Sequence, residues 1–221
     1  REWAYDHYAG KDWLKLRAAR TNVPSENQRR IVAQGDYVYA TLSYDAPLSI
    51  LNAATGKTIA TIEATHGTRE IVVSDGIAVV YAKPQDDTAA ERRGNQTTDD
   101  GVLVAVNAQT GDLLWKHTSG TLKALTLAID NGRIIYLTGK MIVARDLKSG
   151  EELWQTRPKR TSPRTLLTVD DVVVMQGGRS VETMNATNGE HLWQKQGASI
   201  GGAESEDLFV IDGLVWRGMQ S

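Results

Sequence analysis

The sequence predicts an all-β fold, a β-propeller with about four four-stranded blades and the opening hairpin of a fifth. Two repeated patterns that share one period carry this prediction. The first is a turn segment that recurs as LNAATGKTIATI from Leu51, VNAQTGDLLWKH from Val106, RDLKSGEELWQT from Arg145 and MNATNGEHLWQK from Met184. Its glycines, Gly56, Gly111, Gly150 and Gly189, are separated by 55, 39 and 39 residues.

The second pattern is a pair of β-rich runs joined by a two-residue turn. The turns are centred on Gly35-Asp36, Asp75-Gly76, Asn131-Gly132, Asp170-Asp171 and Asp212-Gly213. Asp-Gly and Asn-Gly between apolar runs favour a type I′ hairpin, because both central residues of that turn need positive φ. Each unit of about 40 residues therefore holds two hairpins, which is the content of one propeller blade.

A β-sandwich is the alternative fold, but it does not account for two identical 39-residue spacings. The longer first spacing has 16 extra residues, which fall in the polar stretch 83–101. We expect this stretch to be an exposed insertion between strands. Residues 31–221 form the repeat region, and residues 1–30 are expected to be the tail of a preceding blade with a linking segment, including a short helix from Asp12 to Arg20. Because the chain begins at Arg1 without a methionine, we expect a longer parent polypeptide.

Composition excludes several classes of function. The formal net charge is −2 with a pI near 6.1, so nothing in the charge balance calls for a nucleic-acid partner. No apolar run is long enough to span a bilayer. The chain contains no cysteine, which excludes disulfides, thiolate metal sites and cysteine nucleophiles within it.

The turn segments also share a longer motif, Ala-x-Asp/Asn-x-x-Thr/Ser-Gly-x-x-x-Trp. It is complete at residues 105–115 and 144–154, and degenerate at 183–193 and 50–60. The motif residues are Ala105, Asn107, Gly111, Trp115, Ala144, Asp146, Gly150, Trp154, Asn185, Gly189 and Trp193. This pattern resembles the tryptophan-docking motif of the quinoprotein-dehydrogenase-like (PQQ-like) propellers. The resemblance implies that Trp115, Trp154 and Trp193 each lie against the glycine turn of a neighbouring blade, and it implies a periplasmic or otherwise extracytoplasmic protein.

The PQQ-like family includes dehydrogenases that use pyrroloquinoline quinone and a non-enzymatic propeller lipoprotein of outer-membrane protein assembly. In the quinone-dependent members of this family, the quinone lies near a disulfide of adjacent cysteines, and Ca²⁺ is held by Glu, Asn and Asp. A resemblance to these enzymes would imply the same groups here. This chain has no cysteine, and no such acidic set can be assigned from its sequence. We therefore predict no catalytic, cofactor-binding or metal residue in this segment, with pyrroloquinoline quinone and Ca²⁺ as the cofactors of the alternative function.

Few residues outside the motif suggest chemistry. The histidines His7, His66, His117 and His191 do not stand at metal-ligand spacing. The basic run from Arg157 to Arg164 is the most distinctive surface feature and is a candidate loop for an anionic ligand; its cations are Arg157, Lys159, Arg160 and Arg164. Arg17, Arg20, Arg29 and Arg30 would reinforce it if the fold brought them near.

Taken together, the sequence favours a non-catalytic propeller scaffold that binds a protein or a glycan through loops on one face. The alternatives are part of a quinoprotein oxidoreductase whose cofactor ligands lie outside this segment, or an accessory propeller fused to a separate catalytic domain. Because about four and a half blades leave an open arc, we expect the arc to be completed by further blades of the same chain or by a second copy.

Overall fold

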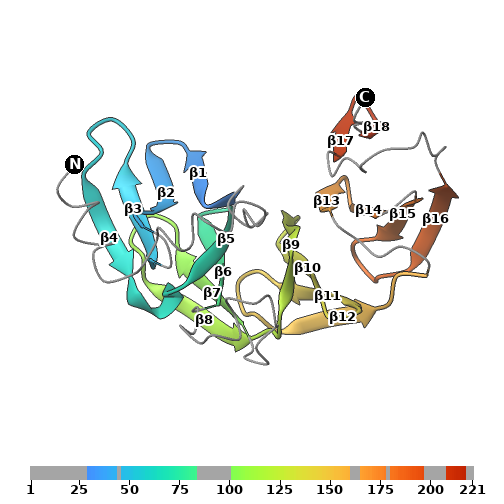
Figure 1. The fold of residues 1–221 in the computed structure, drawn as a ribbon, viewed down its shortest axis with the longest axis horizontal. Helices are drawn as coiled ribbons and strands as arrows, with labels where there is room; N and C mark the ends of the chain where they lie inside the picture. Colours follow the sequence, from blue (N-terminus) through green and yellow to red (C-terminus); the bar gives the residue numbers. More distant parts are fainter. Residues whose placement is uncertain are drawn as a thin grey trace, which may run out of the picture.

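The computed structural model describes residues 29–43, 46–83, 101–159, 165–177, 180–196 and 208–217. These residues form antiparallel sheets that follow one another along the chain, and Figure 1 shows the sheets arranged as an open arc. Blade 1 contains β1 (Ile31–Gln34), β2 (Tyr37–Thr41), β3 (Leu48–Asn52) and β4 (Thr58–Ile62). Blade 2 follows a short 3₁₀ turn, η2 (Glu63–Thr65), and contains β5 (Thr68–Ser74), β6 (Ile77–Ala82), β7 (Val102–Asn107) and β8 (Leu113–Thr118).

The remaining strands repeat this order. Blade 3 contains β9 (Leu122–Asp130), β10 (Arg133–Thr138), β11 (Met141–Asp146) and β12 (Glu152–Thr156). Blade 4 contains β13 (Thr165–Val169), β14 (Val172–Gly177), β15 (Ser180–Asn185) and β16 (His191–Gln196). A final hairpin consists of β17 (Leu208–Ile211) and β18 (Leu214–Arg217). The predicted fold, four blades and the first hairpin of a fifth, is confirmed.

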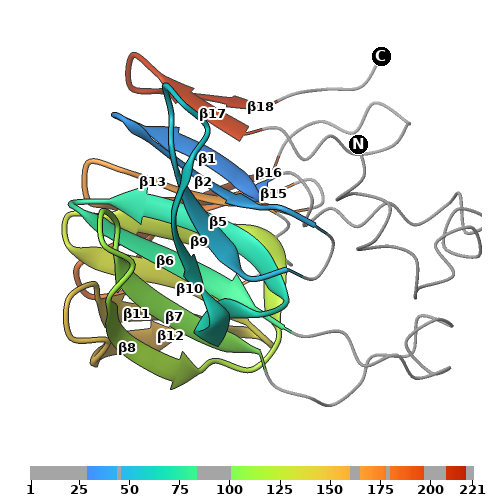
Figure 2. The ribbon, with the colours of Figure 1, turned by 90° about the vertical axis from the view of Figure 1, so that its left-hand side faces the viewer.

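The first strands of the blades, β1, β5, β9, β13 and β17, line the inside of the arc, and the fourth strands lie on its outside (Figure 1). Each sheet is a meander in which neighbouring strands are consecutive in sequence. The turns between first and second strands therefore lie at the same end of the sheets as the turns between third and fourth strands. We call this end the turn face. The opposite end, where second strands meet third strands and one blade leads to the next, is the connection face. Figure 2 shows the arc from the side, with hairpin turns projecting at the left.

The first hairpin turns have the backbone conformations that their residues favour. Asp75, Asn131, Asp170 and Asp212 have positive φ, as do the residues that follow them, Gly76, Gly132, Asp171 and Gly213. The turn at Gly35-Asp36 differs, because only Gly35 has positive φ (56°). A glycine at the first central position alone is typical of a type II′ turn, the other turn that matches strand twist.

The core consists of apolar layers between successive blades. Ile50 of blade 1 packs in one layer with Val80 of blade 2, Leu103 of blade 2 packs with Ile134 of blade 3, and a third layer joins blades 3 and 4. Because strand side chains alternate between the two faces of a sheet, each inner blade contributes to the layers on both sides of it. None of the helices in the described part of the chain is long and apolar enough to cross a membrane.

The predicted domain bounds lie partly outside the described residues. Residues 1–28, with the expected helix from Asp12 to Arg20, and residues 84–100 of the predicted insertion lie there. The insertion is bounded by described residues, since β6 ends at Ala82 and β7 begins at Val102.

Candidate functional site

Trp115 reaches from the outer strand of blade 2 to the turn of blade 3. Its indole Nε1 donates a hydrogen bond to the carbonyl oxygen of Leu147, 2.9 Å away. The ring covers Gly150, because a Cβ built on that glycine would lie 2.8 Å from Cδ2 of the indole. Gly150 has a φ of 75°, so a side chain there would strain the backbone as well as displace the indole. One contact thus requires both the tryptophan and the glycine of the motif.

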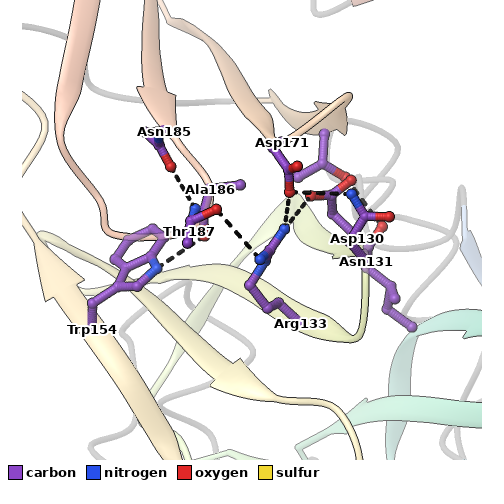
Figure 3. A network of polar contacts seen from close by, with 10 residues as sticks. Asp130, Asn131, Arg133, Trp154, Asp171, Asn185, Ala186 and Thr187 are labelled. Atoms are coloured by element: carbon purple, nitrogen blue, oxygen red, sulfur yellow. Dashed lines mark hydrogen bonds and ion pairs between the residues drawn. The ribbon is translucent and has the colours of Figure 1, made fainter.

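Trp154 makes the same contact one blade further along. Its Nε1 donates to the carbonyl oxygen of Ala186 at 3.0 Å (Figure 3), and a Cβ on Gly189 would lie 2.6 Å from Cε3 of the ring. A large aromatic ring buries on the order of 200 Å². Each such contact therefore stabilises the packing of one blade on the next at the outside of the arc. Both tryptophans point toward the blade that follows in sequence.

The two ends of the series differ from its middle. In blade 1, Ala60 stands where the motif has tryptophan, and its Cβ would lie 3.0 Å from a Cβ on Gly111. Gly56, the turn glycine of blade 1, has nothing within 4 Å of a Cβ built on it. At the other end, Trp193 is 45% exposed. The described part of the chain includes only the first hairpin of the next unit, β17 and β18, so the docking of Trp193 on a glycine turn stays a prediction.

A small residue stands opposite each docked tryptophan. Ala105 pairs with Trp115 across β7 and β8, and Ala144 pairs with Trp154 across β11 and β12. Both alanines are fully buried. Directly paired residues project from the same side of a sheet, so a small side chain leaves room for the indole. In blade 4 Thr183 takes this position.

The polar residue that opens each turn holds the turn closed. Asn107 Oδ1 accepts hydrogen bonds from the backbone N–H groups of Gln109 and Thr110, at 2.9 and 3.0 Å. Asn185 Oδ1 accepts one from Thr187 N at 2.7 Å. These are the Asx-type bonds that Asn and Asp make with their own backbone.

Asp146 makes the same bonds with a carboxylate. Its Oδ1 accepts from Lys148 N at 2.9 Å and from Ser149 N at 2.7 Å. The bond from Ser149 is the largest cause that holds the pKa of Asp146 below its usual value, against a smaller opposing effect of desolvation. The turn therefore stabilises the charged form of this side chain.

Arg133 joins blades 3 and 4 on the turn face, a contact that the sequence pattern did not predict. Its guanidinium contacts Asp130 of its own hairpin at 3.2 Å and Asp171 of the next blade (Figure 3). Asn131 also donates to Asp171 at 3.1 Å. The hydrogen bond from Asn131 is the first cause that lowers the pKa of Asp171, with Arg133 adding to it. The sequence offered one signal for this contact: polar turn residues such as Asn131 and Asp171 recur about 40 residues apart, at the spacing of the blades.

Glu182 is a buried carboxylate on β15 that was also missed. It is fully buried between blades 3 and 4, and its Oε1 accepts from Lys159 N at 2.8 Å. His191 Nε2 lies 3.2 Å from the same oxygen. The strand pairings place Val104 and Val143 at the matching positions of blades 2 and 3. An alignment of the repeats would have shown a glutamate at a position where blades 2 and 3 have valine, and this was the one sequence signal for Glu182.

Arg29 connects the inner strands of three blades. Its Nη1 lies 3.1 Å from Glu70 Oε1 on β5 and donates to the carbonyl of Leu127 on β9 at 2.7 Å. Glu70 is almost fully buried. Arg29 is thus directed to the inside of the arc, not to the basic run with which the sequence interpretation associated it.

The candidate anionic-ligand loop leaves the outer strand of blade 3 at the connection face. Arg157 and Lys159 are exposed, and Arg157 Nε lies 3.3 Å from Met141 Sδ beside the turn between β10 and β11. Arg160 and Arg164 lie outside the described residues. The described half of the run thus presents two cations beside a neighbouring turn of the same blade.

Three of the four histidines lie in the described residues, and His7 does not. His117 is on β8, where burial lowers its pKa and the charge of Arg145 adds to the lowering. Within the described ranges, no group of three or more His, Cys, Asp or Glu side chains could hold a metal ion.

Comparison with known proteins agrees with this geometry. The family model described as outer membrane protein assembly factor BamB matches residues 99–213, half of the chain. The chain belongs to this family. The sequence itself matches no curated protein significantly.

Solved structures show where this BamB-family chain stands among propellers. BamB from Moraxella catarrhalis aligns with a TM-score of 0.59 at 19% identity, over 76% of this chain and 48% of the other. The computationally designed Ika8 protein aligns with a TM-score of 0.65 at 16% identity, over 84% of this chain and 53% of the other. A quinohemoprotein alcohol dehydrogenase from Pseudomonas putida aligns with a TM-score of 0.53 at 13% identity, over 85% and 37%. This chain thus spans about half the length of the first two structures, and the likeness shows the shared fold.

Charge is divided between the two faces of this BamB-family chain. Acidic residues dominate the described hairpin turns and the strand residues beside them; they are Asp36, Asp75, Asp112, Asp130, Asp146, Glu151, Glu152, Asp170, Asp171, Glu190 and Asp212. The cations of that face are Lys57, Arg133, Arg145 and Lys148. The balance is reversed at the connection face, whose described cations are Arg29, Arg30, Arg69, Lys83, Lys116, Lys123, Lys140, Arg157, Lys159 and Lys195. Its described acids are Glu63, Glu70 and Glu182.

Proposed function

We propose that this chain is a non-catalytic propeller scaffold that binds other proteins through its connection face. The observation that carries the proposal is the match of residues 99–213 to a family described as an outer membrane protein assembly factor. We extend the proposal to an extracytoplasmic location, which the same description supports.

The architecture supports a binding role. The layers between blades are filled with apolar side chains, and the motif tryptophans are used to join blades. The connection face carries the loops whose lengths vary between blades, and variable loops on a rigid scaffold are where binding residues gather.

The test uses the chain's lack of cysteine, which makes any introduced cysteine a unique attachment point. We expect saturable binding of an unfolded outer-membrane β-barrel protein, diluted from urea and followed by fluorescence anisotropy. A polyethylene glycol chain attached at Lys140→Cys on the connection face should block this binding. The same group at Lys148→Cys on the turn face should leave it intact.

A quinone titration separates the scaffold from the oxidoreductase alternative. With pyrroloquinoline quinone and Ca²⁺ added to the purified chain, we expect no quinone absorbance after desalting. Stoichiometric retained quinone would overturn the non-catalytic proposal, and equal binding by both polyethylene glycol conjugates would overturn the assignment to the connection face.

A further inference from the structure

The connection face of blades 3 and 4 carries cations that local structure does not require. On the turn face, acidic residues have a local reason to be present, since Asp favours the positive-φ turn positions and accepts backbone hydrogen bonds there. Asp146 is an example. No comparable turn chemistry calls for Lys140, Arg157 or Lys159. Their presence at one end of the sheets therefore points to something outside the fold.

These cations form a continuous series along the arc. Lys83 Nζ donates to Thr121 Oγ1 at 3.2 Å, which places the end of β6 beside the link that leads to Lys123. Thr138 Oγ1 donates to the carbonyl of Ser119 in that same link at 2.7 Å, and Lys140 follows two residues later. The contact of Arg157 with Met141 then joins Lys140 to the basic run. We call the series Lys83, Lys123, Lys140, Arg157 and Lys159 the basic arc.

Three cations of the basic arc, Lys140, Arg157 and Lys159, are not paired with the described carboxylates of its face. Glu70 lies against Arg29, and Glu182 is buried against His191 and the backbone of Lys159. Across the described ranges, no carboxylate forms an ion pair with Lys140, Arg157 or Lys159. By sequence, residues 84–100, which follow Lys83, contain five acidic residues and two arginines, and residues 197–207, which follow β16, contain three acidic residues. We therefore place the surface on the cations between these two stretches, from Lys123 to Lys159.

We propose that the basic arc of blades 3 and 4 docks an acidic segment of a partner protein. This inference rests on the proposed scaffold function and names the chemistry of its partner. The cations are spread over successive elements, which suits an extended chain with several carboxylates better than a single small anion. None of the large apolar side chains that are exposed in the described residues lies at the basic arc, and binding to a membrane surface relies on such anchors.

The test is titration with a fluorescein-labelled glutamate-rich peptide, with a glutamine-rich peptide of equal length as reference. We expect binding of the glutamate peptide alone, and its loss as salt is raised, because exposed charges are screened within about 8 Å at physiological ionic strength. The double variant Lys140→Gln/Lys159→Gln should bind about three- to tenfold more weakly. The matched variant Lys57→Gln/Lys148→Gln removes two exposed cations from the turn face and should bind as the unmodified chain does.

Three outcomes overturn the proposal: no binding of the glutamate peptide at low salt, equal weakening by both double variants, or binding only to vesicles that contain phosphatidylserine. The last result would assign the basic arc to a membrane surface. If the unfolded β-barrel protein still binds to Lys140→Gln/Lys159→Gln with unchanged affinity, the scaffold function stands and only the acidic chemistry of its partner fails.

Discussion

Trp154 and Trp193 occupy equivalent positions in successive blades, yet only Trp154 is docked on a described glycine. We expect Trp154→Ala to lower the free energy of unfolding by about 3–5 kcal/mol, the range for truncating a buried aromatic. Trp193→Ala should cost less than about 1 kcal/mol because nearly half of the side chain is already in water. Urea denaturation followed by circular dichroism measures both without relying on tryptophan fluorescence. Equal denaturation midpoints for the two variants would contradict a stabilising role for the docked ring.

Asp146 should make stability depend on pH. Its pKa is lower in the folded state, so its contribution is fully present above the unfolded value near 3.9 and is lost as pH falls through the folded pKa. Asp146→Ala should cost about 1 kcal/mol at neutral pH through loss of the turn bonds. Asp146→Asn is the matched control, since Asn107 and Asn185 close the equivalent turns. It should retain most of the stability at neutral pH and lose less of it in acid. Parallel acid profiles for the aspartate and asparagine forms would refute the assignment.

Individual turn residues could be predicted from the sequence because few residue types fit these turn positions. Gly150 and Gly189 could be located from spacing alone, since positive φ and contact with an indole both exclude other residues. The contacts of Glu182 and Arg133 could not be located. They depend on which side chains two separate blades bring together, and no local rule encodes that.

Among the strands, β15 and β16 carry Glu182 and His191 in contact, where the equivalent strands of blade 2 carry Val104 and Leu113. Removal of one member of a buried pair is costly, whereas replacement of both by apolar residues is often neutral. We therefore expect His191→Leu alone to lower the free energy of unfolding by about 3 kcal/mol. The double variant Glu182→Val/His191→Leu should recover most of this loss. Thermal denaturation of the two variants and the parent tests the coupling, and strictly additive effects would count against it.

Strand content was predictable because hairpin turns leave a strong local signal. All five two-residue turns join the strands expected on either side of them. The irregularities were not predictable. The pairing between the third and fourth strands shifts in all four blades, next to the residue opposite the motif position that holds tryptophan in blades 2 to 4 and Ala60 in blade 1. Such bulges redirect a side chain. Whether they stabilise the fold depends on what that side chain meets in the neighbouring blade.

For the whole molecule, the final hairpin presents apolar residues that its own chain does not cover in the described structure. Phe209, Ile211, Leu214 and Trp216 are each more than half exposed, although β17 packs beside β13. A two-stranded hairpin is marginally stable alone. We therefore expect the 221-residue chain to self-associate at micromolar concentration, as sedimentation velocity would show. A single species near 24 kDa across the concentration range would contradict this prediction.

A matched pair of variants locates that association. Phe209→Ser/Trp216→Ser should shift the sedimentation profile toward the monomer. Leu113→Ser/Leu153→Ser removes two similarly exposed apolar side chains from the outer strands of blades 2 and 3 and should leave the profile unchanged. If the outer-strand variant alone dissociates the assembly, the contact lies along the rim of the arc.

The period of the repeats predicted the arc as a whole, because equal spacing requires equal units that stack in one direction. The division of charge between the two faces was not predicted from the sequence. Acidic and basic residues alternate along the chain, and they separate only when the meander sends alternate connections to opposite ends of the sheets.

Because each docked tryptophan packs on the blade that follows it in sequence, its contact can form only after that later blade has been synthesised. During synthesis from the amino terminus, blade 2 is complete before the turn that receives Trp115 has been made. Blades 2 and 3 therefore each carry a solvent-exposed indole until the next blade emerges from the ribosome, and a pause in translation would prolong that exposure. A chaperone that recognises nascent aromatic residues would meet these two indoles, Trp115 and Trp154, 39 residues apart.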